Sequence, residues 1–457
     1  YALCLLVLYR VLIVVFHLNK EYAFLPFLIT LFFAVHPIHT EIVNSLKNRD
    51  ELFVMLFGML FLLYGYYYYT KTTGRWKYAL LSLFFLTLTL MSKISGLIFV
   101  GLLILVFFFN DFFKGKIIIL TGARQVGKTT LVDAILSDED KVYRLNADDP
   151  ADKLTLENQN FDILDNLFTD KSIIFIDEAQ KIQNIGTTLK LLVDHYKSSK
   201  QIIATGSSTL NLLSNTSEAL TGRKFVHELY GLSVREISPE LDSLVLEKIL
   251  PLLLVYGSYP EVFTSSIESK RRILTEITSS YLYQDILELE NIRNPSVIHK
   301  LLSAIALQLG SEVSLNELSS LTGLDVKTVE RYIDLLEKNY VLFRLPPYYT
   351  NQRKTLSKLN KIYFYDLGIR NALINNFNQP DLRTDIGALW ENFLMLERMK
   401  LRSYHSLYAN QYFWRTYGGA EVDLVEERSG NLFGYEFKWG TKKVASPVSW
   451  LEYPNAT

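Results

Sequence analysis

Hydrophobic residues are very unevenly distributed along this chain. Five apolar runs fill its first quarter, at about residues 1–18, 22–35, 52–69, 78–91 and 94–109. A membrane-spanning helix needs about 20 apolar residues, because the hydrocarbon core of a bilayer is about 30 Å thick. The pattern therefore predicts a transmembrane region of about five spans in residues 1–113.

After residue 113 the pattern changes. Short β-branched runs at 116–121, 172–177 and 201–205 predict buried strands, and amphipathic segments between them predict helices, which is typical of an α/β fold. The whole chain is 49% hydrophobic and 21% charged, yet residues 1–113 carry only 13 charged side chains. The two parts differ in kind, which excludes a single globular domain.

Charge adds two expectations. The net charge of −1 excludes a bulk basic field of the kind that attracts nucleic acid. The loop at 70–77 carries Lys71, Arg75 and Lys77 without an acid, which predicts that it is cytoplasmic. With five spans, the part after residue 113 is then cytoplasmic too. We expect a multi-pass membrane protein, with membrane lipid as one partner.

A phosphate-binding loop follows the first predicted strand. It matches the pattern G-x-x-x-x-G-K-[ST] and consists of Gly122, Ala123, Arg124, Gln125, Val126, Gly127, Lys128, Thr129 and Thr130. Glycines let the backbone wrap a phosphate, and the amides and the following helix N-terminus supply positive potential. We expect Lys128 to neutralise the β- and γ-phosphates of ATP, and Thr129 to bind Mg²⁺.

The rest of a nucleotide site is predicted at the ends of later strands. Asp177 would hold Mg²⁺, and Glu178 would polarise the attacking water as general base. Thr205 or Ser207 would contact the γ-phosphate, unless they only form a turn. Arg223 is a candidate arginine finger that would act in a homo-oligomer, or else a surface arginine in an ion pair.

These residues carry a family resemblance. The segments GARQVGKTTL, IIFIDEAQ, ATGSS and LTGR, followed by YGSYPEVF and SSYLYQDILE, resemble a prokaryotic AAA-type ATPase family whose members have a further C-terminal domain. The similarity covers about residues 115–450. It implies ATP and Mg²⁺ as ligands and ATP hydrolysis as the activity, without showing what the hydrolysis drives.

A helix–turn–helix pattern lies at 315–336, with Gly323 at the turn and apolar spacing that fits a winged helix. Its second helix, at 325–338, has three basic and four acidic residues. Because binding to phosphates requires a basic face, a structural or protein-contact role is favoured over DNA readout.

Four charged residues near the C-terminus form a nuclease-like pattern. Glu391 lies in a predicted helix, Asp423 in an alternating strand, and Glu436 and Lys438 on one face of the next strand. Asp423 and Glu436 would hold Mg²⁺, while Lys438 would steady the water or the phosphate. The pattern resembles the PD-(D/E)XK nuclease core, which implies nucleic acid as a partner. The alternative is a nuclease fold that has lost its activity.

A second resemblance lies in the apolar part. The segments HPIHTEIVNSLKNRDELF and LMSKISGLIFV resemble polytopic O-mannosyltransferase-like membrane proteins with the GT-C fold, which usually carry tetratricopeptide repeats. This resemblance implies sugar transfer from a lipid-linked donor.

We therefore expect an α-helical membrane segment followed by an α/β P-loop AAA-type ATPase, a winged helix and an α/β nuclease-like domain. The predicted domains are a transmembrane region at 1–113, an ATPase core at 114–238, a helical linker or lid at 239–300, a winged helix at 301–350 and a nuclease-like domain at 351–457.

The predicted function is Mg²⁺-dependent ATP hydrolysis coupled to the nuclease-like domain. Two alternatives stay open: a fragment of a GT-C glycosyltransferase, and a nucleotide-dependent scaffold that does not hydrolyse ATP. Residues 112–116 join the two parts with almost no linker. A fusion of two unrelated proteins is thus a further expectation, and the ATPase part by itself would then be cytoplasmic.

Overall fold

The structure is a computed structural model of the chain. It describes residues 2–15, 24–35, 49–70, 75–92, 114–137, 141–158, 161–207, 220–238, 242–281, 295–349, 359–416, 418–440, 446–453 and 455–457. The chain divides into two compact units, Tyr1–Lys114 and Gly115–Thr457.

The first unit is helical. Its described elements are α1 (Ala2–Val14), α2 (Leu25–Val35), α4 (Arg49–Thr70) and α5 (Arg75–Ser92). Helices α1 and α4 share a small core around Cys4, Val11, Met59 and Leu63. Apolar side chains form this unit, as the sequence pattern predicts, but they are arranged in short helices.

Among the described residues, no helix combines the length and the apolar character that crossing a bilayer requires. At 1.5 Å per residue, α1 and α2 are only about 20 Å and 16 Å long, well short of the hydrocarbon core. The longer α4 begins with Arg-Asp-Glu and ends in a run of tyrosines, and α5 begins with Arg-Trp-Lys.

The predicted multi-pass membrane localisation is therefore wrong, and the orientation and the lipid partner inferred from it lose their basis. The fifth expected span, at 94–109, lies outside the described residues. The fold class is corrected accordingly, from a membrane segment to a helical region that precedes the α/β part.

The second unit begins with a parallel five-stranded sheet in the order β2-β3-β4-β1-β5. Its strands are β1 (Ile117–Thr121), β2 (Val142–Asn146), β3 (Ile173–Asp177), β4 (Gln201–Gly206) and β5 (Lys224–Glu228). The helices around it are α7 (Lys128–Ile135), α8 (Pro150–Glu157), α9 (Phe161–Phe168), η3 (Ala179–Lys181) and α10 (Ile185–Tyr196).

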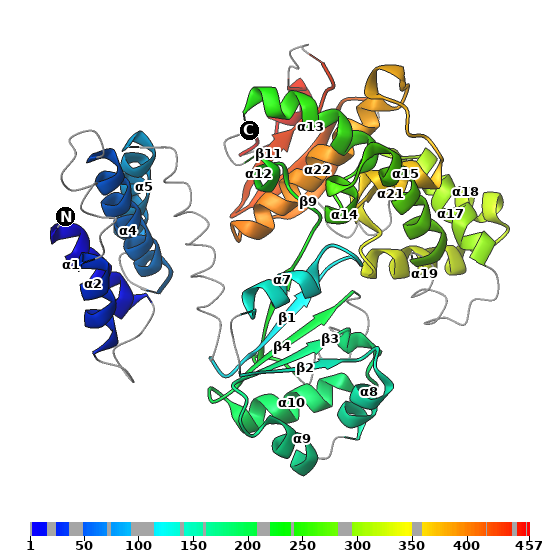
Figure 1. Cartoon of the computed structure of the whole chain (residues 1–457). Helices are drawn as coiled ribbons and strands as arrows, with labels where there is room; N and C mark the ends of the chain where they lie inside the picture. Colours follow the sequence, from blue (N-terminus) through cyan, green and yellow to red (C-terminus); the bar gives the residue numbers. More distant parts are fainter. Residues whose placement is uncertain are drawn as a thin grey trace. The chain divides into compact units, whose positions relative to one another are not determined.

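Alternating side chains decide what each face of this sheet buries. Ile117 and Ile119 of β1 join a core with residues of α8, α9 and α10, whereas Ile118 points to the opposite face. Figure 1 shows α8, α9 and α10 on one side of the sheet and α7 on the other. Because both faces are covered, the strands are continuous apolar runs, as is usual for parallel sheets.

A mostly helical region follows the sheet. It contains α12 (Val234–Ile237), α13 (Ser243–Tyr256), α14 (Pro260–Thr264), α15 (Ile267–Glu276), the π-helical turn η5 (Ile277–Tyr281), α17 (Pro295–Leu307), α18 (Leu315–Thr322) and α19 (Val326–Lys338). Gly323 ends α18 with a φ of 77°, a left-handed conformation that glycine adopts without strain. Asp325 then caps α19 through the Thr328 amide. The result is a helix–turn–helix.

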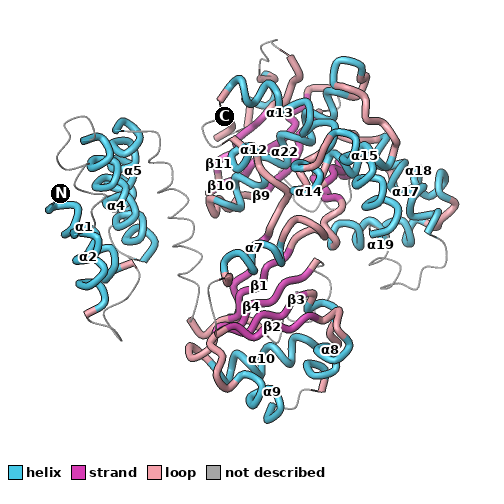
Figure 2. The backbone as a smooth tube through the Cα atoms, in the orientation of Figure 1, coloured by secondary structure: helices cyan, strands magenta, loops and turns pink. Residues whose placement is uncertain are grey.

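Three short antiparallel strands border this helix–turn–helix: β6 (Glu312–Val313), β7 (Leu342–Leu345) and β8 (Asn360–Phe364), in the order β6-β8-β7. Figure 2 shows that the C-terminal part combines helices with strands. Its further elements are α21 (Leu367–Leu373), η6 (Pro380–Leu382), α22 (Ile386–Tyr404), β9 (Asn410–Arg415), β10 (Glu421–Arg428), β11 (Asn431–Tyr435) and α23 (Val448–Leu451). The last three strands form an antiparallel sheet in the order β11-β10-β9, and α22 packs on it through Phe393, Phe413 and Leu424.

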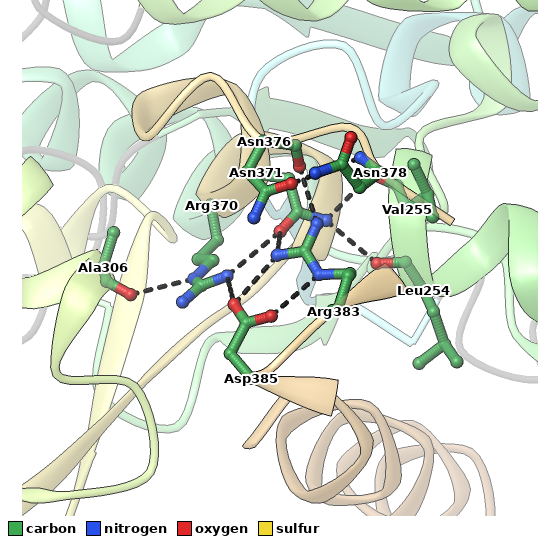
Figure 3. Close-up of polar contacts among 9 residues, drawn as sticks. All are labelled: Leu254, Val255, Ala306, Arg370, Asn371, Asn376, Asn378, Arg383 and Asp385. Atoms are coloured by element: carbon green, nitrogen blue, oxygen red, sulfur yellow. Dashed lines mark hydrogen bonds and ion pairs between the residues drawn. The ribbon is translucent and has the colours of Figure 1, made fainter. Parts of the chain in front are cut away.

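A buried polar network ties these helices together (Figure 3). The guanidinium groups of Arg370 and Arg383 both donate to the carboxylate of Asp385, the residue directly before α22. Arg370 also donates to the Ala306 carbonyl of α17, and the Asn371 amide donates to two carbonyls near the end of α13. Since one carboxylate serves two buried arginines, other acceptors satisfy the remaining guanidinium donors: the Ala306 carbonyl for Arg370 and the Asn376 carbonyl for Arg383.

Candidate functional site

The phosphate loop lies between β1 and α7. Gly122 has a φ of 151°, and a Cβ there would lie 2.1 Å from the Leu229 carbonyl oxygen. Gly127 has a φ of 93° and Gln125 a φ of 61°, so the loop depends on left-handed conformations. Arg124 is half-buried, and Gln125 and Thr130 are exposed.

The loop is also attached to the helical region. Ala123 and Val126 are buried in the core that α13, α17 and α19 share. Thr121, directly before the loop, accepts a hydrogen bond from the Tyr340 hydroxyl at 2.9 Å. The loop is therefore held by distant segments of the chain, and Tyr340 lies 219 positions from Thr121.

Lys128, the first residue of α7, is only 5% exposed. Its Nζ donates to the carbonyl oxygens of Gly122 and Ala123, at 3.0 Å and 2.8 Å. The ammonium group thus lies over the loop, where a phosphate would meet it.

A helix and a strand bring hydroxyls to one carboxylate. The Thr129 hydroxyl of α7 donates to Asp177 Oδ2 at 2.9 Å, and the Thr205 hydroxyl of β4 donates to Asp177 Oδ1. Asp177 ends β3, which pairs with β4 in the sheet. The loop threonine and the strand-end aspartate, which lie 48 residues apart in sequence, are thus in contact.

Glu178 has a left-handed backbone, with a φ of 51°. Its Oε2 accepts a hydrogen bond from the Gln180 side-chain amide at 2.5 Å, and the same amide donates to the Ser207 hydroxyl at 2.9 Å. Gln180 was not predicted from the sequence. The sequence feature that could have pointed to Gln180 is its position two residues after Glu178, in the segment IDEAQ.

Arg223 lies away from this group. It directly precedes β5, whose first residue, Lys224, pairs with Ile117 at the start of β1. The phosphate loop follows the other end of β1, so Arg223 is about 16 Å away along the parallel strands. Its Nε forms an ion pair with Asp194 of α10 at 2.5 Å. Within one chain, Arg223 does not reach the loop.

The C-terminal domain contains a second group of charged residues, which we call the carboxylate cluster: Lys361, Glu391, Glu421, Asp423, Glu436 and Lys438. Lys361 of β8 is almost fully buried, and its Nζ contacts Glu391 at 3.0 Å and Glu421 at 2.6 Å. The Tyr363 hydroxyl donates to Glu391 at 2.5 Å. Although burial opposes it, these two carboxylates raise the pKa of Lys361, which keeps the ammonium charged.

Asp423 is buried where the register between β10 and β9 shifts, which places it in a β-bulge. Its Oδ2 accepts a hydrogen bond from the Phe437 amide at 2.7 Å. Burial, together with the charges of Glu391 and Glu436, raises the pKa of Asp423 to about 7.

Glu436 and Lys438 follow β11 rather than extending it, because the strand ends at Tyr435. They form an ion pair of 2.5 Å, with Lys438 half-exposed. The hydrogen bond with Glu436 and the charge of Asp423 raise the pKa of Lys438 against the effect of burial. Glu436 Oε2 is buried without a hydrogen-bond partner.

The structure thus brings Glu391, Asp423, Glu436 and Lys438 within electrostatic range of one another. In the part of the chain that the structure describes, no three His, Cys, Asp or Glu residues are arranged to hold a metal ion. Two carboxylates, Asp423 and Glu436, remain as the expected ligands. The predicted site did not include Lys361, which lies in a strand without a motif, or Glu421, which lies two residues before Asp423 in β10.

Comparisons with known proteins cover most of the second unit. Residues 114–238 match an AAA domain, 247–380 a domain of unknown function (DUF8612) and 386–452 another domain of unknown function (DUF4143). The AAA match confirms the AAA part of the predicted family. These three segments begin at residue 114, so they give no support to the GT-C resemblance of residues 1–113, and none of their descriptions mentions a nuclease.

Relatives of similar length share this part. Uncharacterized proteins of Mycobacterium bovis and Mycobacterium tuberculosis are each 30% identical over 330 residues, which is 71% of this chain and 70% of the relative. An uncharacterized protein of Methanocaldococcus jannaschii is 25% identical over 304 residues, 62% of this chain and 66% of the relative.

Proposed function

The chain belongs to the family of these mycobacterial proteins, and its own AAA domain precedes DUF8612 and DUF4143; on that premise we propose that it is an ATPase. AAA domains in general bind ATP with Mg²⁺. The observation that carries the proposal is the 2.9 Å hydrogen bond between Thr129 and Asp177, because these are the two residue types that hold Mg²⁺ in phosphate-loop enzymes.

The other residues take roles that follow from their positions. Lys128 would move from the loop carbonyls to the β- and γ-phosphates, and Thr129 and Asp177 would hold Mg²⁺, which neutralises phosphate charge. Glu178 would accept the proton of the attacking water. Gln180 restrains Glu178 and Ser207 together, so we infer that this contact opens when the γ-phosphate is bound.

ATP turnover by the purified full chain tests this function. Lys128→Ala should abolish Mg²⁺-dependent release of phosphate, whereas Lys190→Ala, at an exposed lysine of α10, should leave it unchanged. Glu178→Gln should bind ATP and turn it over at least about 100-fold more slowly. Unchanged turnover in Lys128→Ala would refute the proposal, and ATP binding without any turnover in the native chain would support a nucleotide-dependent scaffold instead.

A second function is favoured by the carboxylate cluster. We propose that the C-terminal domain hydrolyses phosphodiesters with Mg²⁺ held by Asp423 and Glu436. Four carboxylates there face only two lysines, with Arg415 at the exposed edge 3.9 Å from Glu421. A cation would relieve this excess of negative charge, and Mg²⁺ needs only one or two carboxylates when phosphate and water complete its shell.

Cleavage of labelled DNA and RNA by the full chain tests the second function. Mg²⁺-dependent cleavage should be lost in Glu436→Ala and retained in Glu247→Ala, which changes an exposed acid of α13. Absence of cleavage on single-stranded and duplex substrates of both kinds, with Mg²⁺ or Mn²⁺, would leave a nuclease fold without activity. ATP turnover would be unaffected by that result, so the two proposed functions fail separately.

A further inference from the structure

Two tryptophans lie beside the carboxylate cluster. Trp390 directly precedes Glu391 on α22, and Trp439 directly follows Lys438. Their ring centroids are 5.3 Å apart with an interplanar angle of 71°, so the rings meet edge to face. Trp390 is partly buried and stacks on Phe393, with centroids 5.7 Å apart. Trp439, in contrast, is 43% exposed.

This arrangement fixes an aromatic surface that solvent can reach. Trp390 is held by the core, and its contact with Trp439 restricts how the exposed ring can turn. An exposed tryptophan in a fixed orientation loses little conformational freedom when a flat ligand stacks on it. The neighbouring Lys438 is 54% exposed, so a cationic group and an aromatic face lie next to each other.

We propose that Trp439 binds an unpaired base of a nucleic acid whose phosphate lies at Lys438. This proposal deepens the proposed phosphodiesterase function and rests on it, because the same site then acts on the bound strand. An aromatic face accepts any base, since every base has a π-face, and the lysine contributes phosphate binding. The substrate class is therefore single-stranded nucleic acid, or a duplex with an unpaired nucleotide.

The unpaired state follows from geometry. In a duplex each base is covered on both faces by its neighbours, so an enzyme that stacks on a base must take an unstacked one. The carboxylates around Lys438 repel phosphates when no cation is present. Binding should therefore need a divalent cation as well as a free base.

Binding of a fluorescently labelled oligodeoxythymidine to the full chain tests the proposal. Ca²⁺ in place of Mg²⁺ should allow binding without cleavage, and fluorescence anisotropy gives the Kd. Trp439→Ala should weaken binding about 5- to 150-fold, the range expected for loss of one stacked base, and Trp439→Phe should retain most of it. Trp76→Ala, which removes a tryptophan that is 81% exposed in the first unit, should change nothing.

The outcomes distinguish the base-stacking site from the phosphodiesterase function. Equal binding by Trp439→Ala and the native chain, tighter binding of a fully paired, blunt-ended duplex than of the single strand, or no binding of either would overturn the proposal. Binding that depends on Trp439 in a chain that cleaves no substrate would refute the phosphodiesterase function and leave the stacking site standing. Quenching of tryptophan fluorescence by the unlabelled oligonucleotide, lost in Trp439→Phe, gives an independent readout.

Discussion

The phosphate-loop site and the carboxylate cluster both contain buried or half-buried acids, but they hold them with different partners. Asp177 accepts hydrogen bonds from the neutral hydroxyls of Thr129 and Thr205. In the cluster, Glu391 and Glu421 share the buried ammonium of Lys361. The phosphate-loop site therefore orients its acid with neutral donors, whereas the carboxylate cluster neutralises its acids with a buried cation.

This difference has energetic consequences. A hydrogen bond from a neutral hydroxyl to a carboxylate contributes about 1.5–3 kcal/mol, and removing the hydroxyl leaves no unpaired charge on the donor side. Removing one member of a buried ion pair leaves an uncompensated charge, which is much more costly. We therefore expect the cluster to influence stability and pH dependence, and the phosphate loop to influence turnover.

The largest effect is expected for Lys361→Met. This change leaves Glu391 and Glu421 without their common partner, so it should destabilise the C-terminal domain by about 3–5 kcal/mol. Thermal melts followed by circular dichroism measure it. Lys128→Met is the matched control, since it removes two hydrogen bonds to loop carbonyls and should lower stability by about 1 kcal/mol. Equal losses in the two variants would contradict the comparison.

Gly122→Ala should destabilise the phosphate loop, because the backbone at this position leaves no room for a side chain. The new Cβ would lie 2.1 Å from the Leu229 carbonyl, so the backbone must shift at a cost of about 2 kcal/mol or more. Gly127→Ala meets no atom within 4 Å, and its positive φ alone should cost about 1 kcal/mol. The melting temperature and ATP affinity of both variants test whether Gly122→Ala has the larger effect. A larger effect of Gly127→Ala would contradict this prediction.

The pH dependence of stability should reflect the protonation of the Asp423 carboxyl group. Its pKa of about 7 in the folded chain lies above the ordinary value, so the folded state binds the proton more tightly than the unfolded state. Stability should thus fall as pH rises towards about 7, by up to about 1.4 kcal/mol per pH unit. Asp423→Asn should remove this slope in urea titrations and keep the contact with the Phe437 amide. Mg²⁺ binding should release a proton near pH 7. If the slope of stability against pH is unchanged in Asp423→Asn, another group is responsible for it.

The smallest effect is expected for Arg223→Ala. The ion pair with Asp194 is between two side chains that are each more than one third exposed, so its loss should change stability by less than about 1 kcal/mol. Turnover by dilute protein should also be unchanged, because Arg223 lies at the opposite end of β1 from the loop. A turnover that rises with protein concentration and is lost in Arg223→Ala would instead indicate an arginine finger acting between subunits.

Local sequence was informative where chemistry depends on fixed spacing. The phosphate loop and the strand ending at Asp177 were predicted because a buried β-branched strand, a glycine turn and a helix start follow one another directly. Hydrophobicity alone misled in the first unit, because apolar composition does not specify helix length. The structure divides those runs into helices as short as α2, with 11 residues.

The carboxylate cluster was only partly predictable. Glu436 and Lys438 are close in sequence, whereas Lys361 comes from β8 and shows no pattern of its own. Gln180 and Tyr340 likewise reach the phosphate-loop site through side-chain contacts that no spacing rule encodes. Trp390 and Trp439 are 49 positions apart, and only the packing of α22 against the segment after β11 brings their rings together.

The sequence by itself determined the order of the segments and the position of the phosphate loop between a strand and a helix, because strand ends and helix starts set these positions over a few residues. Tertiary structure decided the partners of each charge: which acid meets a hydroxyl, which meets a buried lysine, and which arginine is too far from the loop to act within its own chain. Those partners depend on contacts between distant segments, and the free energy of a buried charge is set by its neighbours in space.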